Sequence, residues 1–102
     1  MKRIEIMISR ALDEEFLDLI EANDLTHFTA INPVIGKGFS NPKLGTPVWP
    51  QTNILYIFYV GEKDVEKLTK IISRLRTEFP SEGLGAFSTE AGCIDGCSEI
   101  MK

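Results

Sequence analysis

The amino-acid sequence predicts an α+β protein in which two helices cover one face of a four-stranded antiparallel sheet. Three observations support this class. Ile4, Ile6 and Ile8 alternate with other residues, as in a strand with one apolar face. Two later stretches repeat apolar residues at helical spacing. Residues 54–60 form an unbroken apolar and aromatic run that is typical of a buried strand.

The first half of the chain predicts a strand, a helix and a second strand. After the isoleucine strand, Asp13, Glu14 and Glu15 place acids where the dipole of a new helix favours them. That helix carries one apolar stripe and ends near Asn23. Residues 26–35 predict the second strand, and Pro33 indicates an edge position or a bulge near its end. The apolar stripe consists of Leu12, Phe16, Leu19 and Ile20.

The second half repeats the order strand, helix, strand. The run over 54–60 is the third strand, and Gly61 ends it. Residues 64–79 predict a helix with a long apolar side, which Pro80 stops because proline cannot continue a helix. Residues 84–89 predict the fourth strand. The resulting β-α-β-β-α-β order is the ferredoxin-like arrangement.

Two helices can cover only one face of such a sheet, yet the third strand is apolar on both sides. We therefore expect the other face to be buried against further copies of the same chain.

Composition and charge narrow the function classes. The 102 residues suit one domain, and 43% hydrophobic with 25% charged residues is ordinary for a globular protein. A net charge of −4 does not favour a nucleic-acid binder, which needs a basic face for phosphates. No apolar run approaches the roughly 20 residues of a membrane span, and the N-terminus lacks a signal-peptide pattern. We expect a cytoplasmic protein whose two cysteines do not form a constitutive disulfide.

The connection over about residues 36–53 is unusually long, because most connections in compact domains have about 4–6 residues. It carries the only tryptophan, Trp49, among apolar residues that a disordered linker rarely holds. We interpret it as a recognition loop, although Trp49 fits equally well a role in packing the loop over the sheet edge. The candidate partner-facing residues are Phe39, Lys43, Leu44 and Trp49.

Gly36, Lys37 and Gly38 open this loop. Glycines allow backbone conformations that present successive N–H groups to an anion, and Lys37 adds charge. A bulge that ends the strand explains the same two glycines.

The run Val34-Ile35-Gly36-Lys37-Gly38 resembles the Val-x-Gly-x-Gly motif at the base of the T-loop in the PII-like superfamily. Element order and length extend the resemblance over residues 1–102, as one domain. It implies a homotrimer with an adenine nucleotide held by its phosphates in clefts between subunits. It also implies a mobile loop that contacts a partner protein such as a transporter or an enzyme. The corresponding second phosphate loop contributes Gly83 and Gly85.

The chain also departs from the nitrogen-regulatory PII proteins. Phe39-Ser40 replaces their Arg-Gln, no tyrosine lies between Phe39 and Asn53, and their second phosphate loop has a lysine that this chain lacks. The sequence therefore resembles most closely the divergent, uncharacterised PII-like branch.

Cys93 and Cys97 lie in the tail, about residues 91–102, with a spacing that is neither a redox Cys-x-x-Cys nor a zinc quartet. They are interpreted as a reversible disulfide, as part of a metal site, or as two ordinary cysteines. If folding brings the only histidine, His27, beside them, the alternative function is metal binding, similar to the CutA-like divalent-cation-tolerance proteins. No Ser-His-Asp arrangement is present, so we expect a signalling protein and no enzyme.

Overall fold

The computed structural model describes residues 1–37, 43–48 and 50–95, and within them it has the predicted order of elements. The elements are β1 (Lys2–Ser9), a 3-10 helix η1 (Arg10–Leu12), α1 (Asp13–Ala22), β2 (Thr29–Val34), β3 (Asn53–Val60), α2 (Glu62–Glu78) and β4 (Leu84–Glu90). No helix in these ranges is both long enough and apolar enough to cross a bilayer.

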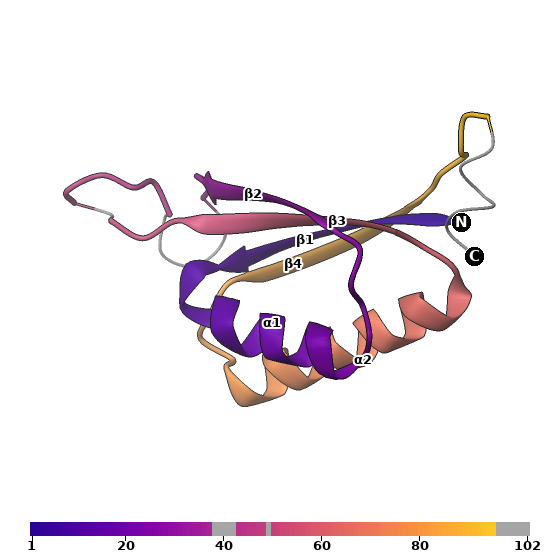
Figure 1. Cartoon of the computed structure of the whole chain (residues 1–102). Coiled ribbons are helices and arrows are strands. Elements are labelled where there is room, and N and C mark those ends of the chain that lie inside the picture. Colours follow the sequence, from indigo (N-terminus) through magenta and orange to yellow (C-terminus); the bar gives the residue numbers. More distant parts are fainter. Residues whose placement is uncertain (38–42, 49, 96–102) are drawn as a thin grey trace.

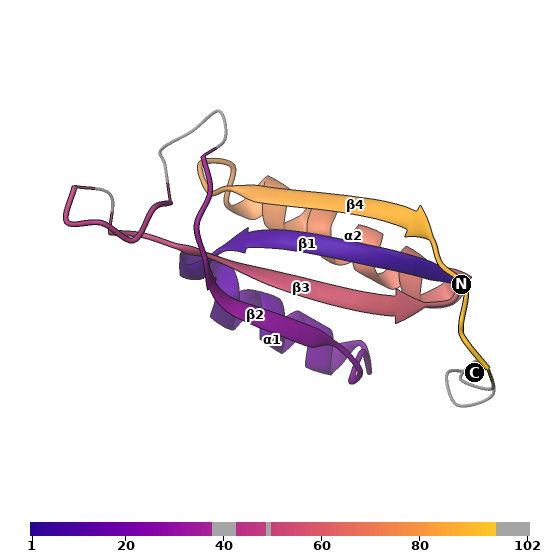
Figure 2. The ribbon, with the colours of Figure 1, turned by 90° about the horizontal axis from the view of Figure 1, so that it is seen from above.

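The four strands form one sheet in the order β2-β3-β1-β4, and each neighbouring pair is antiparallel (Figure 2). Both helices lie on the same face of this sheet (Figure 1). The predicted fold class is therefore confirmed. The long loop and the α2–β4 connection leave the same end of the sheet, and the N-terminus lies at the other end (Figure 1).

The second strand confirms both expectations drawn from Pro33. β2 is an edge strand, and its pairing with β3 shifts register between Ile31 and Val34. The Asn32–Pro33 peptide bond is cis. The strand begins at Thr29, three residues later than predicted, because the turn after α1 extends further than the sequence pattern indicated. In that turn Asp24 has a φ of 58°, and the N–H of Leu25 donates to the carbonyl of Ile20 at 3.0 Å.

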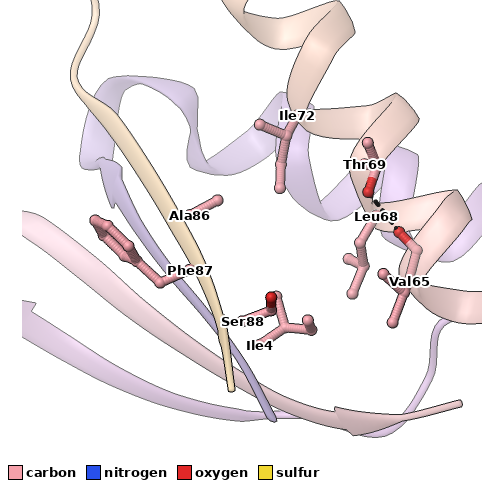
Figure 3. Close-up of a pocket in the computed structure, with 8 residues that line it drawn as sticks. All are labelled: Ile4, Val65, Leu68, Thr69, Ile72, Ala86, Phe87 and Ser88. Carbon is pink, nitrogen blue, oxygen red and sulfur yellow. Dashed lines mark hydrogen bonds between the residues drawn. The ribbon is translucent and has the colours of Figure 1, made fainter. Parts of the chain in front are cut away.

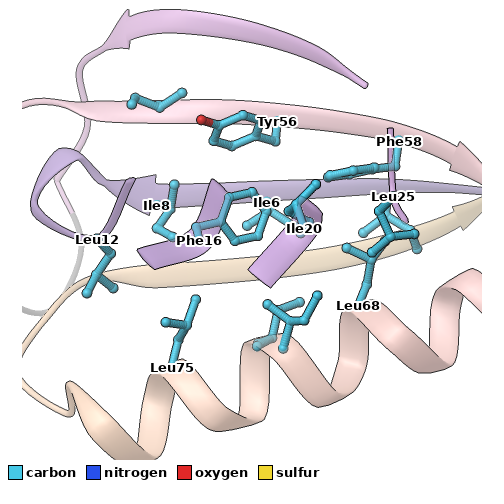
Figure 4. Close-up of a cluster of buried hydrophobic side chains, with 14 of the residues drawn as sticks. Ile6, Ile8, Leu12, Phe16, Ile20, Leu25, Tyr56, Phe58, Leu68 and Leu75 are labelled. Atoms are coloured by element: carbon cyan, nitrogen blue, oxygen red, sulfur yellow. The ribbon is translucent and has the colours of Figure 1, made fainter. Parts of the chain in front are cut away.

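The hydrophobic core lies between the helices and one face of the sheet (Figure 4). Alternate residues of β1 and β3 point into it, because successive side chains of a strand lie on opposite faces. Fifteen buried apolar residues make up this core: Ile4, Ile6, Ile8, Leu12, Phe16, Ile20, Leu25, Ile54, Tyr56, Phe58, Val60, Leu68, Ile71, Ile72 and Leu75.

The other face of the sheet is here called the open face. In the single chain Leu55 and Ile57 are half-buried and Tyr59 is 39% exposed on this face. The expected burial against further copies stays a prediction. The helices cover only the opposite face, so these side chains have no layer above them. By strand register the open face includes Arg3, Glu5, Met7, Ile31, Leu55, Ile57, Tyr59 and Phe87.

Candidate functional site

Four strand ends and the segments that follow them meet at one end of the sheet (Figure 2). β1 and β2 end there, and β3 and β4 begin there. The N–H of Ser9 donates to the carbonyl of Gly83 at 3.0 Å, and the N–H of Arg10 donates to the carbonyl of Thr52 at 3.1 Å. The short helix η1 therefore joins the returning end of the long loop to the glycine segment before β4.

The described part of the long loop is closed twice by its own backbone. Gly36 and Lys43 exchange two hydrogen bonds, N–H to carbonyl, of 2.9 and 2.7 Å. Further along, the N–H of Gly45 donates to the carbonyl of Gln51 at 3.2 Å, and the ammonium of Lys43 donates to the side chain of Gln51 at 2.6 Å. In this conformation the N–H of Gly36 is engaged within the loop and does not face an open anion site.

Several of the residues predicted to bind a ligand or a partner come together here. Gly36 and Lys43 form the first closure, and Gly83 touches the end of β1 through Ser9. Gly85 lies within β4, opposite Met7, where a side chain in its place would meet the ring of Phe87 at 3.3 Å. Two further predicted residues are described at this end: Lys37, which is exposed, and Leu44, which is half-buried.

Four predicted residues lie outside the part of the chain that the structure describes, so their predicted roles stay predictions: Gly38, Phe39, Trp49 and Cys97.

Arg10 was not among the residues predicted to form the site. Its Nε–H donates to the hydroxyl of Thr52 at 3.2 Å, and its terminal NH2 group donates to the side-chain oxygen of Asn32. Asn32 belongs to β2 and Thr52 precedes β3, so Arg10 holds the two strands that flank the loop. The available signal was a basic residue directly after a buried strand, where loops commonly carry function.

A cavity of about 340 Å³ lies beside Arg10. Its lining consists of Arg10, Ala11, Pro50, Gln51 and Thr52. Within this lining the guanidinium is the only charged group. The arrangement therefore offers hydrogen-bond donors and positive charge to an anion.

A second cavity, of about 150 Å³, lies between α2 and the edge strand β4 (Figure 3). The side chains that line it are apolar apart from those of Thr69 and Ser88, and the Thr69 hydroxyl already donates to the carbonyl of Val65 at 2.8 Å. Because no charged side chain lines it, this cavity is not suited to a phosphate or a carboxylate.

Tyr56 is the buried titratable group nearest the start of α1. Burial raises the pKa of Tyr56 well above its ordinary value, and the hydrogen bond that its hydroxyl donates to Asp13 raises it further. The phenol therefore stays neutral at ordinary pH and acts as a fixed donor. The hydrogen bond connects β3 to the start of α1.

Of the three interpretations given to the cysteines, the structure contains the disulfide, because Cys93 is disulfide-bonded. The expectation that the bond is reversible and not constitutive stays a prediction. The chain turns sharply just beyond Cys93, where Asp95 has a φ of 45°. His27 is exposed, with its Nδ1 3.1 Å from the hydroxyl of Thr26. Among the residues the structure describes, no three metal-ligating side chains gather into a group.

No protein-family model matches the sequence, and no curated protein matches it. Solved structures do match. CPII from Thiomonas intermedia K12, bound to ADP and bicarbonate, is 23% identical with a TM-score of 0.67, over 90% of this chain and 88% of that one. The apo form of CPII is 19% identical with a TM-score of 0.58, over 91% and 92% of the two chains.

A PII-like signaling protein from Thermus thermophilus also matches, with 19% identity and a TM-score of 0.61, over 95% of this chain and 92% of that one. At these identities the comparisons establish the fold. The chain therefore has the fold of PII-like proteins, as the loop-base motif and the element order predicted.

Proposed function

We propose that the chain is a divergent member of the PII-like superfamily and acts as a small regulatory protein that binds an adenine nucleotide. The observation that carries this proposal is the meeting of the long-loop base and the Gly83 segment at one end of a PII-like sheet, joined by η1. Structures of CPII, which has the same fold, contain ADP and AMP. The proposed activity of this chain is therefore ligand binding and signalling, without catalysis.

The proposed phosphate site consists of backbone from the two glycine segments with a nearby cation. The glycines that would allow close backbone approach are Gly36, Gly38, Gly83 and Gly85, and Lys37, which follows Gly36 in the sequence, is exposed. Because the N–H of Gly36 is bonded to Lys43 in this conformation, a phosphate that takes this donor must open the first loop closure. Ligand binding is thereby coupled to the loop, as in order–disorder switches.

The proposed assembly is a homotrimer that covers the open face. Ile31 and Phe87, at opposite edges of this face, are 47% and 57% exposed in the single chain, and Met7 lies between them. Contiguous apolar surface of this kind marks interfaces between proteins. A cytoplasmic location and a protein partner, such as a transporter or an enzyme that contacts the loop, belong to the same proposal.

The metal-binding alternative gains no support from a specific observation. A cysteine binds a metal ion through its free thiolate. The sulfur of Cys93 is instead held in a disulfide. His27 contacts Thr26. We therefore rank nucleotide binding first.

Calorimetric titration with ATP, ADP, AMP and cyclic AMP tests the proposal. We expect at least one of them to bind, and the Lys37→Gln variant to bind it more weakly. Lys70→Gln, which removes an exposed lysine from α2, serves as the matched control and should bind like the wild type. Absence of both heat and thermal shift with all four compounds would contradict nucleotide binding.

A further inference from the structure

Arg10 carries a positive charge that no described carboxylate neutralises. Its two side-chain partners, Thr52 and Asn32, are neutral oxygens, and the described ion pairs all involve other residues. The nearest acid along the chain, Asp13, accepts a hydrogen bond from the hydroxyl of Tyr56. In a chain with a net charge of −4, this makes the Arg10 cavity a local site of uncompensated positive charge.

The guanidinium is also held in a fixed orientation. It has five N–H donors in one plane. The bonds to Thr52 and Asn32 use two of them and restrain the plane, so three donors remain without a partner among the described residues. A planar fork of this kind is suited to two oxygens of one phosphate group.

The cavity has room for a phosphate group, and its polar groups lie beside a lining that is mostly apolar. Gln51 and Thr52 add an amide and a hydroxyl to the lining, and the ammonium of Lys43 lies 2.6 Å from the Gln51 side-chain oxygen. The volume of about 340 Å³ is at the lower end of the roughly 300–1,000 Å³ of ligand pockets. It therefore suits a phosphate or diphosphate group, with the remainder of a larger ligand lying outside.

We propose that Arg10 is the phosphate-binding cation of this end of the sheet, and that the cavity beside it takes the terminal phosphate groups of the nucleotide. The nucleoside part of this inference rests on the proposed function, whereas the phosphate-binding part stands without it. Because Arg10 holds Asn32 before the loop and Thr52 after it, a phosphate bound to the guanidinium is linked to both flanks of the loop by single hydrogen bonds.

Calorimetry with sodium pyrophosphate alone tests the phosphate-binding part. The wild type should bind pyrophosphate, and Arg10→Gln should bind it at least about tenfold more weakly, as expected from the loss of one charge-assisted hydrogen bond. Arg76→Gln is the matched control, because Arg76 lies at the same end but donates to the carbonyl of Leu84 and is not part of the lining. It should bind like the wild type.

Arg10→Lys is a second variant, for the case in which Arg10→Gln does not fold. It keeps the positive charge and removes the planar fork. With a thermal midpoint like that of the wild type, it should still bind pyrophosphate more weakly. No binding to the wild type, or equal binding to Arg10→Gln, Arg10→Lys and Arg76→Gln, would overturn the inference.

The same variants separate this inference from the nucleotide proposal. Pyrophosphate binding that depends on Arg10, without any response to ADP, would support the phosphate site and contradict nucleotide binding. ADP binding that is unchanged in Arg10→Gln would support nucleotide binding and overturn the role of Arg10.

Discussion

The hydroxyl of Tyr56 donates a hydrogen bond to the carboxylate of Asp13, so the middle of β3 is tied to the first residue of α1. The Tyr56 ring also lies against two aromatic neighbours, with centroid distances of 4.8 Å to Phe16 and 5.4 Å to Phe28. The hydrogen bond between Tyr56 and Asp13 positions the start of α1, which follows η1. It thereby helps to hold Arg10 at the end of the sheet.

Replacing Tyr56 by phenylalanine should lower the free energy of unfolding by about 2 kcal/mol, because a hydrogen bond to a charged group is lost. The pKa of Tyr56 is raised in the folded state, so its contribution is complete below about pH 10 and is lost as the pH rises above that value. Urea unfolding at pH 8 and at pH 10.5 measures this. The difference between wild type and Tyr56→Phe should shrink at the higher pH, and an unchanged difference would contradict the assignment.

A charge at the centre of the open face should prevent oligomer formation. Leu55 pairs with Met7 on one side and with Ile31 on the other, so a glutamate there would be buried among apolar side chains in an assembly. We expect Leu55→Glu to be a folded monomer and the wild type to be a trimer in light scattering. Lys70→Glu, on the outer surface of α2, should leave the trimer intact. A wild-type monomer at micromolar concentration would exclude the proposed interface.

Substitution of Gly45 tests whether the base of the loop holds the described backbone conformation. Its φ is 68°, and a β-carbon there would lie 3.2 Å from the methyl group of Thr52. Gly45→Ala should therefore destabilise the protein by about 1 kcal/mol or more. Gly61→Ala is the matched control, because φ is −89° and a β-carbon there meets nothing within 4 Å. Equal unfolding midpoints for the two variants would show that the loop base does not hold this conformation.

The ion pair between Lys2 and Glu90 joins the outer ends of β1 and β4. The hydrogen bond from Lys2, and then its charge, lower the pKa of Glu90 below the ordinary 4.5. The stabilisation is therefore present above about pH 4.5 and is lost as the pH falls through the lowered folded-state pKa. Between pH 6 and pH 3 at low salt, the midpoint temperature of thermal unfolding should fall less steeply for Glu90→Gln than for the wild type. Because both groups lie at the surface, 0.5 M salt should remove most of that difference.

Much of the fold was predictable because its signals are local. The alternation of Ile4, Ile6 and Ile8 and the stop at Pro80 each depend on neighbours along the chain, and the elements they predicted are present. Pro33 correctly indicated an edge strand with irregular pairing. The apolar run over 54–60 also predicted that further copies of the chain cover the open face, and this stays a prediction because it depends on contacts between chains.

The site was predicted only in part, because its geometry depends on contacts between distant segments. The glycines at 36 and 83 were identifiable as loop features. Arg10 was not, because its importance arises from Asn32 and Thr52, which flank a long loop and meet only in the folded sheet. The closure between Gly36 and Lys43 was likewise invisible, because no sequence pattern specifies a single backbone bridge inside a loop.

Calorimetric titration of ADP into the wild type and into the Leu55→Glu monomer tests the central claim most directly. A nucleotide held in clefts between subunits requires the trimer. We therefore predict binding of one ADP for each chain of the wild type, and no measurable binding to the folded Leu55→Glu monomer. ADP binding of equal strength to both proteins, or no binding to the wild type, would contradict the account.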